Sequence, residues 1–328
     1  MEKSLPAYSI AIRTLGKAGE KYLETLKSCA LQTHKPEKIM VYLAEGFEKP
    51  KETIGVEQIV YVPKGMIAQR ALRYDEIDSD YILCLDDDVR LSPDSAERLL
   101  NGLLNNGGDC IAANTFDNDT MPLSQKIIAI LSGTYPHWNQ NYAFRIRSNS
   151  HYSYLNNPKK DVIPTQSLAG PALLIRKEAL LAVHFEEEKW LDVYGYAFGE
   201  DQLLGNKLYK NGFKVLIHYK AGIEHLSAKT SQLSTSYKSY KNKGEMRYLL
   251  MYRSCLDLKH NSMVDRLWCR VSFWLQMIPM EIFQMLRAIR HRTWYLPVAY
   301  VAGTLQGRKK VQMFKNLRKF DDCLDNAR

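Results

Sequence analysis

Short apolar runs alternate with amphipathic stretches through the first two thirds of the chain. Runs of five to eight residues, bounded by polar residues or turns, occupy 8–12, 38–43, 58–62, 81–85, 168–175 and 213–217. Such runs are typical of strands buried on both faces of a parallel sheet. Between them, apolar residues recur at helical spacing, as in 99–104 and 203–208. This alternation predicts an α/β fold with a doubly wound, mostly parallel sheet flanked by helices.

The apolar run 81–85 is followed directly by Asp86, Asp87 and Asp88. Adjacent carboxylates repel one another, so packing alone rarely places three of them at the end of a buried strand. In extended backbone Asp86 and Asp88 point to the same side. Ligands bind at strand ends in open α/β sheets, and hard oxygen ligands suit Mg²⁺ or Mn²⁺. The pattern predicts a divalent metal site; a solvated acidic turn is the alternative.

A second acidic pair, Glu200 and Asp201, precedes the apolar positions of a predicted helix at 203–208. The helix dipole favours ionised carboxylates in the first turn, so we expect Asp201 to be a carboxylate at neutral pH. Simple helix capping would also account for acids at this place. No G-x-G-x-x-G or G-x-x-x-x-G-K-[ST] pattern follows a strand, which argues against a dinucleotide dehydrogenase and a P-loop enzyme.

Residues 117–165 interrupt the alternation. Tyrosines and other aromatic residues are mixed there with Asn, Ser, Arg and Lys, with a period of neither 2 nor 3.6. Long segments of this kind in a compact domain are usually functional or disordered. The segment fits a lid, and it fits equally well an insertion packed by its own aromatic side chains.

The net charge of +9 is concentrated near the C-terminal end. Residues 229–328 contain 19 Lys and Arg against 7 Asp and Glu, a net of +12, whereas residues 1–228 contain 26 and 29, a net of −3. This predicts a catalytic domain over 1–228 and a basic, largely helical region over 229–328. Basic residues beside apolar runs fit a helix lying in the plane of an anionic membrane surface. A subdomain packed on the catalytic core, or a dimer interface, fits as well, so the oligomeric state stays open.

The N-terminal residues lack the apolar core of a signal peptide, and the six cysteines form no C-x-x-C pair. We therefore expect reduced thiols and a cytoplasmic location. Peripheral binding to the inner face of the membrane is compatible with that location.

Several motifs, in this order, resemble the family 2 glycosyltransferases, which are inverting enzymes of the GT-A fold. The resemblance covers roughly residues 7–226. It is carried by Arg13-Thr14, Lys64-Gly65 before Ala68-Gln69-Arg70, Asp86-Asp87-Asp88, Gly170-Pro171, Gly199-Glu200-Asp201, Asn211-Gly212-Phe213 and His225. Each motif is weak alone, but the ordered set is specific. The sequence departs from the family at Ala44-Glu45, where the family has an acidic pair, and at Arg13, where it usually has proline.

The resemblance implies transfer of a sugar from a nucleoside diphosphate sugar to the hydroxyl of a glycan or lipid-linked glycan, with inversion, in cell-surface polysaccharide or glycolipid synthesis. It implies that Asp88 and His225 hold Mn²⁺ or Mg²⁺. Asp201 would be the general base and Glu200 would position the acceptor or the base. The implied donor-binding residues are Arg13, Thr14, Glu45, Gly65, Arg70, Asp86 and Asp87, and the implied acceptor-side residues are Gly170 and Pro171.

Two other functions are open. A metal-dependent sugar nucleotidyltransferase also places D-x-D and a metal on an α/β sheet, but the stretch after the first strand, 13–16, is a poor version of its Gly-rich loop. The second open function is that of a basic protein that binds membrane or nucleic acid and has no catalytic activity. The basic residues are mixed with much apolar surface, so we expect no nucleic acid partner.

Overall fold

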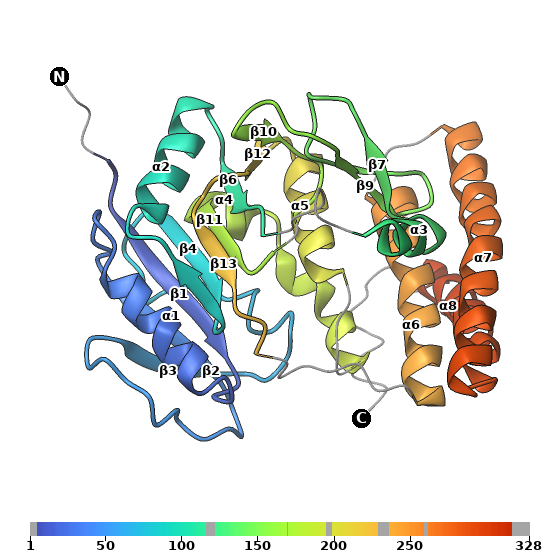
Figure 1. Cartoon of the computed structure of the whole chain (residues 1–328), viewed down its shortest axis with the longest axis horizontal. Coiled ribbons are helices and arrows are strands. Elements are labelled where there is room, and N and C mark those ends of the chain that lie inside the picture. The colour runs from blue at the N-terminus through green and yellow to red at the C-terminus, as the bar shows by residue number, and fades with distance from the viewer. Residues whose placement is uncertain are drawn as a thin grey trace.

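The computed structural model describes residues 5–115, 122–168, 170–194, 199–228, 236–258 and 262–316. Its centre is an eight-stranded sheet in the order β10-β12-β6-β11-β4-β1-β2-β3 (Figure 1). The strands are β1 (Tyr8–Thr14), β2 (Ile39–Ala44), β3 (Gln58–Val62), β4 (Tyr81–Asp86), β6 (Cys110–Ala113), β10 (Val162–Pro164), β11 (Ala172–Arg176) and β12 (Val215–His218). β3, β2, β1 and β4 are parallel, as are β6 and β12, whereas β11 and β10 run antiparallel to their neighbours. The predicted fold class is confirmed.

The two faces of the sheet are covered by different helices. Side chains alternate along each strand, so Ile10 and Ile12 of β1 face one core and Ala11 faces the other. The first core also contains apolar residues of α1 (Glu20–Ala30) and α2 (Ser95–Asn105). The second contains residues of α4 (Lys177–Ala182) and α5 (Glu200–Lys210), with a 3₁₀ helix, η1 (Phe185–Tyr194), between them.

Within the segment 117–165, residues 117–121 lie outside the described chain, and the remainder has regular structure. It forms α3 (Leu123–Leu131) and a small sheet of β7 (Tyr135–His137), β9 (Tyr152–Leu155) and β8 (Phe144–Ile146), before β10 joins the main sheet. The Phe144 and Tyr152 rings meet edge to face, 5.6 Å between centroids. Phe144 and Tyr154 also belong to the main apolar core, and the roles of lid and of insertion both stay predictions.

The C-terminal helices pack on the part of the chain that contains the main sheet and share its core. They are α6 (Tyr237–Tyr252), which runs into a π-helical turn (Arg253–Asp257), α7 (Met263–His291) and α8 (Tyr295–Asn316). α6 and α8 approach closely at glycines, since a Cβ on Gly244 would lie 2.1 Å from the Tyr300 carbonyl oxygen. Met246 and Leu250 of α6 belong to the same apolar cluster as Leu203 of α5. Among the described helices, none combines the length and apolar character needed to cross a bilayer.

Candidate active site

The candidate site is built where β1 and β4 end. These strands are parallel neighbours with Arg13 opposite Asp86, so the residues after them meet at one edge of the sheet. The Arg13 guanidinium donates to Asp86 Oδ1 at 2.9 Å, and the Thr14 hydroxyl donates to the Asp87 carboxylate. Two of the three consecutive aspartates are therefore held by the end of β1.

Arg70 links this aspartate cluster to the acidic start of α5. Its Nη2 lies 3.7 Å from Asp86 Oδ1 and 3.5 Å from Glu200 Oε1, and its Nε lies 3.5 Å from Asp201 Oδ1. The Arg70 side chain is 11% exposed, so these charges interact in a partly desolvated setting. The two acidic motifs, which are far apart in sequence, thus form one cluster around a single guanidinium.

The turn that carries Arg70 is held by Asp192 of η1. The Asp192 carboxylate accepts hydrogen bonds from the backbone N–H groups of Ile67 at 2.7 Å and Ala68 at 3.0 Å. Gly65 leaves room for it, because a Cβ there would lie 2.4 Å from Asp192 Oδ2. Gln69 donates to the Thr14 carbonyl oxygen at 3.1 Å and so fastens the turn to β1. Gly65 therefore shapes the turn that positions Arg70.

Asp88 and His225 are brought together by a short ribbon beside the main sheet. β5 (Val89–Leu91) pairs antiparallel with β13 (Ile223–His225), with Val89 opposite His225. His225 Nε2 lies 3.2 Å from Asp88 Oδ1, and Asp88 Oδ2 accepts from the Ala228 N–H at 2.7 Å. Burial alone would raise the pKa of Asp88, but the hydrogen bonds from His225 and Ala228 lower it below its ordinary value.

The Asp88–His225 pair fits part of a divalent metal site. It presents a carboxylate oxygen and an imidazole nitrogen side by side, and the His225 side chain is 40% exposed, which leaves it accessible. Within the described ranges, no group of three or more His, Cys, Asp and Glu side chains is arranged so that it could hold a metal ion. Mg²⁺ is commonly held by one or two protein carboxylates together with substrate phosphates and water, so a set of two protein ligands is compatible with such an ion.

Burial dominates the electrostatics of the remaining acids. Burial and the neighbouring Asp201 raise the pKa of Glu200 to about 7, although Arg70 opposes the shift. Burial also raises the pKa of Asp201 in spite of Arg70. Burial, together with Asp86 and Asp88, raises the pKa of Asp87 to about 7. The helix dipole considered from sequence favours the carboxylate form of Asp201, whereas desolvation of the partly buried side chain opposes it.

The other predicted residues lie along the same edge. Pro171 accepts a hydrogen bond from the Asp86 N–H at 2.9 Å, which places the Gly170-Pro171 segment beside the cluster. Gly170 has φ +119°, and a Cβ there would lie 3.2 Å from the Ala113 carbonyl oxygen. Glu45 is exposed directly after β2, the neighbour of β1. The predicted site residues therefore lie near the ends of the central strands, on the turn that carries Arg70, on the ribbon or at the start of α5.

Two residues that support the site, Asp192 and Gln69, were not among the sequence candidates. Gln69 lies in the Ala68-Gln69-Arg70 segment that carries the resemblance, so the motif itself could have identified it as a site residue. Asp192 lies in an acidic stretch without a motif, where sequence alone offers no means of telling a buried carboxylate from a solvated one. Burial raises the pKa of Asp192, while its backbone hydrogen bonds oppose that shift.

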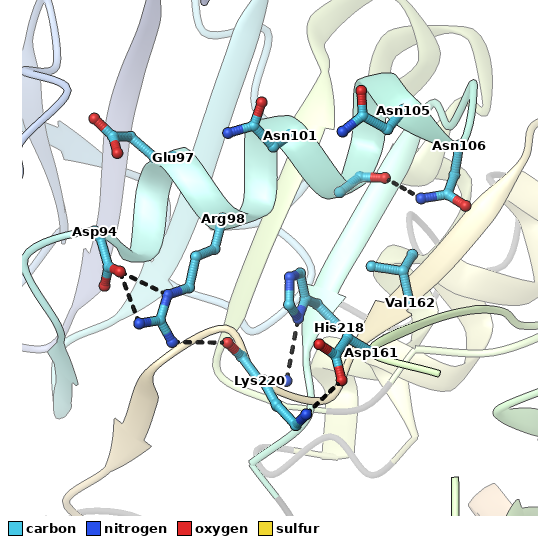
Figure 2. A pocket seen from close by; sticks show the side chains of 11 residues that line it. Asp94, Glu97, Arg98, Asn101, Asn105, Asn106, Asp161, Val162, His218 and Lys220 are labelled. Carbon is cyan, nitrogen blue, oxygen red and sulfur yellow. Dashed lines mark hydrogen bonds and ion pairs between the residues drawn. The ribbon is translucent and has the colours of Figure 1, made fainter. Parts of the chain in front are cut away.

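A hollow of about 500 Å³ lies elsewhere, between α2 and the β10–β12 edge of the sheet (Figure 2). It is lined by two ion pairs, Asp94–Arg98 and Asp161–Lys220. His218 is mostly buried at its wall, and its Nδ1 accepts from the Lys220 N–H at 3.1 Å. The candidate site residues in the described chain are not among those that line this hollow. His218 has a structural hydrogen bond here, separate from the acidic cluster.

Comparison with known proteins supports the fold. No protein-family model and no curated protein matches the chain. Among solved structures, the chain is similar to a mannosyltransferase from Pyrobaculum calidifontis, PcManGT, in complex with GDP-Man and Mn²⁺, with a TM-score of 0.51, 9% identity, and coverage of 93% of this chain and 88% of that one. It is also similar to GalNAc-T7 with UDP, GalNAc and Mn²⁺, with a TM-score of 0.48 and 14% identity over 84% of this chain. The chain spans 56% of the length of that protein. The fold is of the GT-A type.

Proposed function

We propose that the protein is a metal-dependent, inverting glycosyltransferase of the family 2 kind that uses a nucleoside diphosphate sugar. The observation that carries the proposal is the joining of two acidic motifs through Arg70, beside the Asp88–His225 pair, at the carboxyl edge of a GT-A-type sheet. Such an edge is where open α/β sheets bind ligands. The solved PcManGT structure contains GDP-Man and Mn²⁺, which is consistent with this assignment.

In this proposal Asp88 and His225 hold Mn²⁺ or Mg²⁺, which would offset the negative charge that develops on the leaving diphosphate. Arg13 and Arg70 keep the Asp86 carboxylate oriented at the same edge through their ion pairs. Asp86 is 34% exposed and therefore accessible to a ribose hydroxyl or the ion. Thr14, Asp87, Gly65 and Glu45 complete the proposed donor side.

Asp201 is the proposed general base. It would take the proton of the acceptor hydroxyl as that oxygen attacks the anomeric carbon, and the leaving diphosphate would depart from the opposite face, which inverts the configuration. Arg70 counteracts the effect of burial and favours ionised Asp201. Glu200, on the same guanidinium, holds the base in position. Gly170 and Pro171 form the acceptor side next to Asp86.

The proposed acceptor is a hydroxyl of a glycan or lipid-linked glycan, as in the synthesis of cell-surface polysaccharide or glycolipid. The proposed location is the cytoplasm, with peripheral association to the inner face of a membrane. Both proposals follow from the resemblance in the catalytic part and from the basic, apolar composition of the C-terminal region.

The test is a thermal-shift series with UDP, GDP, CDP and dTDP, each with and without Mn²⁺, followed by assay of the matching nucleotide sugars. A ligand that binds only the folded state raises the midpoint temperature of unfolding by mass action. We expect one of these nucleotides to raise it, and only when Mn²⁺ is present. Asp88→Asn should keep the fold and lose that dependence. Glu97→Gln, at a partly exposed position of α2 outside the site, is the matched control. A chain that binds no nucleoside diphosphate, or an Asp88→Asn variant with unchanged Mn²⁺-dependent binding, would contradict the proposal.

A further inference from the structure

The outer side of α7 carries a continuous stripe of exposed apolar residues. Its members are spaced alternately by four and three residues and are between 40% and 75% exposed: Val264, Trp268, Val271, Leu275, Ile278, Ile282, Met285 and Ile289. Residues with this spacing lie along one side of a helix. The opposite side, with Phe273, Met277 and Met280, is buried in the protein core. Figure 1 shows α7 at the edge of the molecule farthest from β1, β2 and β3.

The short helix α3, which contacts α7, also carries exposed apolar residues. None of its residues is buried, although Leu123, Ile127, Ile128 and Ile130 are all apolar and between 41% and 74% exposed. α3 is attached to α7 through Gln276, which donates to the Leu131 carbonyl oxygen at 3.0 Å. We call the eight α7 residues and these four residues of α3 the α7–α3 face. Runs of exposed apolar residues on one side of a helix are a feature of interaction sites.

The chain around the α7–α3 face is strongly basic. Residues 262–311 contain eight Lys and Arg against two Asp and Glu, a net of +6. The exposed basic residues are Arg266, Arg270, Arg290, Arg292, Arg308 and Lys309. None of these six forms an ion pair with another described residue, so their charge is not neutralised within that part of the protein.

We propose that the α7–α3 face docks on an anionic phospholipid membrane, with α7 lying in the plane of the interface. An apolar stripe enters the boundary between headgroups and acyl chains, while flanking Arg and Lys contact lipid phosphates. Trp268 in the stripe and Trp294 beyond the end of α7 are 56% and 62% exposed, and tryptophan prefers this interfacial depth.

The charges favour a lipid over a second copy of the chain. A two-fold interface would bring this segment of net charge +6 close to its own copy, so like charges of the two copies would approach one another. A coiled coil along the stripe would also have to accommodate Pro279, which interrupts the helical hydrogen bonds of α7 at mid-length. An anionic surface instead complements the charge and covers the apolar residues.

The experiment is co-sedimentation of the full chain with phosphatidylcholine vesicles that contain or lack phosphatidylglycerol, at about 0.05 M and about 0.5 M NaCl. We expect binding to the anionic vesicles, weakened by salt because screening shortens the reach of the charges. The double variant Leu275→Gln/Ile282→Gln should bind at least about tenfold more weakly, since it removes two apolar side chains from the interface. Both residues are at least half exposed, so folding should be unaffected.

The matched control is Leu31→Gln/Val56→Gln, which replaces two apolar residues that are 67% and 61% exposed on the catalytic part, and which should bind like the parent. Binding is measured without nucleotide or metal, so its failure leaves the proposed glycosyl transfer untouched. No binding to anionic vesicles at low salt would overturn the proposal. So would a dimer that the Leu275→Gln/Ile282→Gln variant dissociates without any loss of vesicle binding.

Discussion

At the residue scale, the acidic cluster depends on one buried guanidinium. Burial would lower the pKa of Arg70, but Asp201, Glu200 and Asp86 raise it above its ordinary value, so it stays charged. Arg70 in turn opposes the burial that raises the pKa of both Glu200 and Asp201. A lysine could not reproduce this arrangement, because three carboxylates are contacted from two nitrogens of one planar group.

The proposed general base can be tested by a substitution of equal size. Asp201→Asn keeps the shape of the side chain, and no side-chain hydrogen bond caps α5, so folding and nucleotide binding should persist. Transfer should fall by about 10²–10⁴-fold in kcat, because general-base assistance is lost only in the transition state. Single-turnover transfer, measured with the donor found in the thermal-shift series, reports this directly. A rate within a few-fold of the parent would instead point to Glu200 as the base. Gln202→Asn, a substitution at the neighbouring position in the first turn of α5, is the control.

At the element scale, α7 combines an exposed apolar side with an acid that has no partner. Both carboxyl oxygens of Glu281 are buried, without a hydrogen-bond partner among the described residues. Burial raises the pKa of Glu281 to about 7. An unpaired buried acid is costly once it is ionised, so α7 should lose stability when Glu281 is deprotonated.

This arrangement predicts a pH-dependent effect of Glu281→Gln. The folded-state pKa lies above the ordinary value of 4.5, so the unfolded chain loses this proton first. The contribution of Glu281 to the free energy of unfolding therefore falls as pH rises from about 4.5 to about 7. Above that range the full loss of stability from its deprotonation is present. The variant should gain midpoint temperature relative to the parent between pH 5 and pH 8. Glu178→Gln, on the exposed side of α4, is the control, and equal shifts for both variants would contradict the assignment.

At the scale of the whole molecule, the C-terminal helices are joined to the elements that cover the main sheet by a buried ion-pair network. Arg253, in the turn after α6, contacts Glu188 of η1 at 2.8 Å, and Lys207 of α5 contacts the same carboxylate at 3.1 Å. Glu188 is fully buried, and Trp190 Nε1 also donates to it. Together with the shared apolar core, this network makes the sheet and the helices one structural unit.

Removing Arg253 should therefore destabilise the entire chain. Arg253→Met leaves the buried Glu188 with less compensation, and we expect a loss on the order of 3 kcal/mol in the free energy of unfolding. Urea unfolding followed by tryptophan fluorescence and by circular dichroism should still give one coincident transition. Arg73→Met breaks the exposed Arg73–Asp75 pair and should cost less than about 1 kcal/mol. Equal losses in the two variants, or separate transitions for the two probes, would contradict a shared unit.

Much of the architecture is already present in local pattern. Buried strands need apolar residues on both faces and helices need one apolar side, so the periods along the chain identify β1, β4 and α5 without any long-range information. The acidic motifs after β4 and at the start of α5 are local too, because they are read from consecutive residues of the chain. Asp88 and His225 were paired by the resemblance alone, and the β5–β13 ribbon supplies the physical reason.

Tertiary structure decided which charges are buried and which apolar sides stay uncovered. Asp192 and Glu188 look alike in the sequence of η1, yet one holds the turn of Arg70 and the other anchors Arg253. Apolar residues occur on two sides of α7, so the sequence alone does not show which side is buried. The packing of α6, α8 and α3 against α7 decides that. Burial is a property of what lies opposite a side chain, and residues distant in the chain supply that partner.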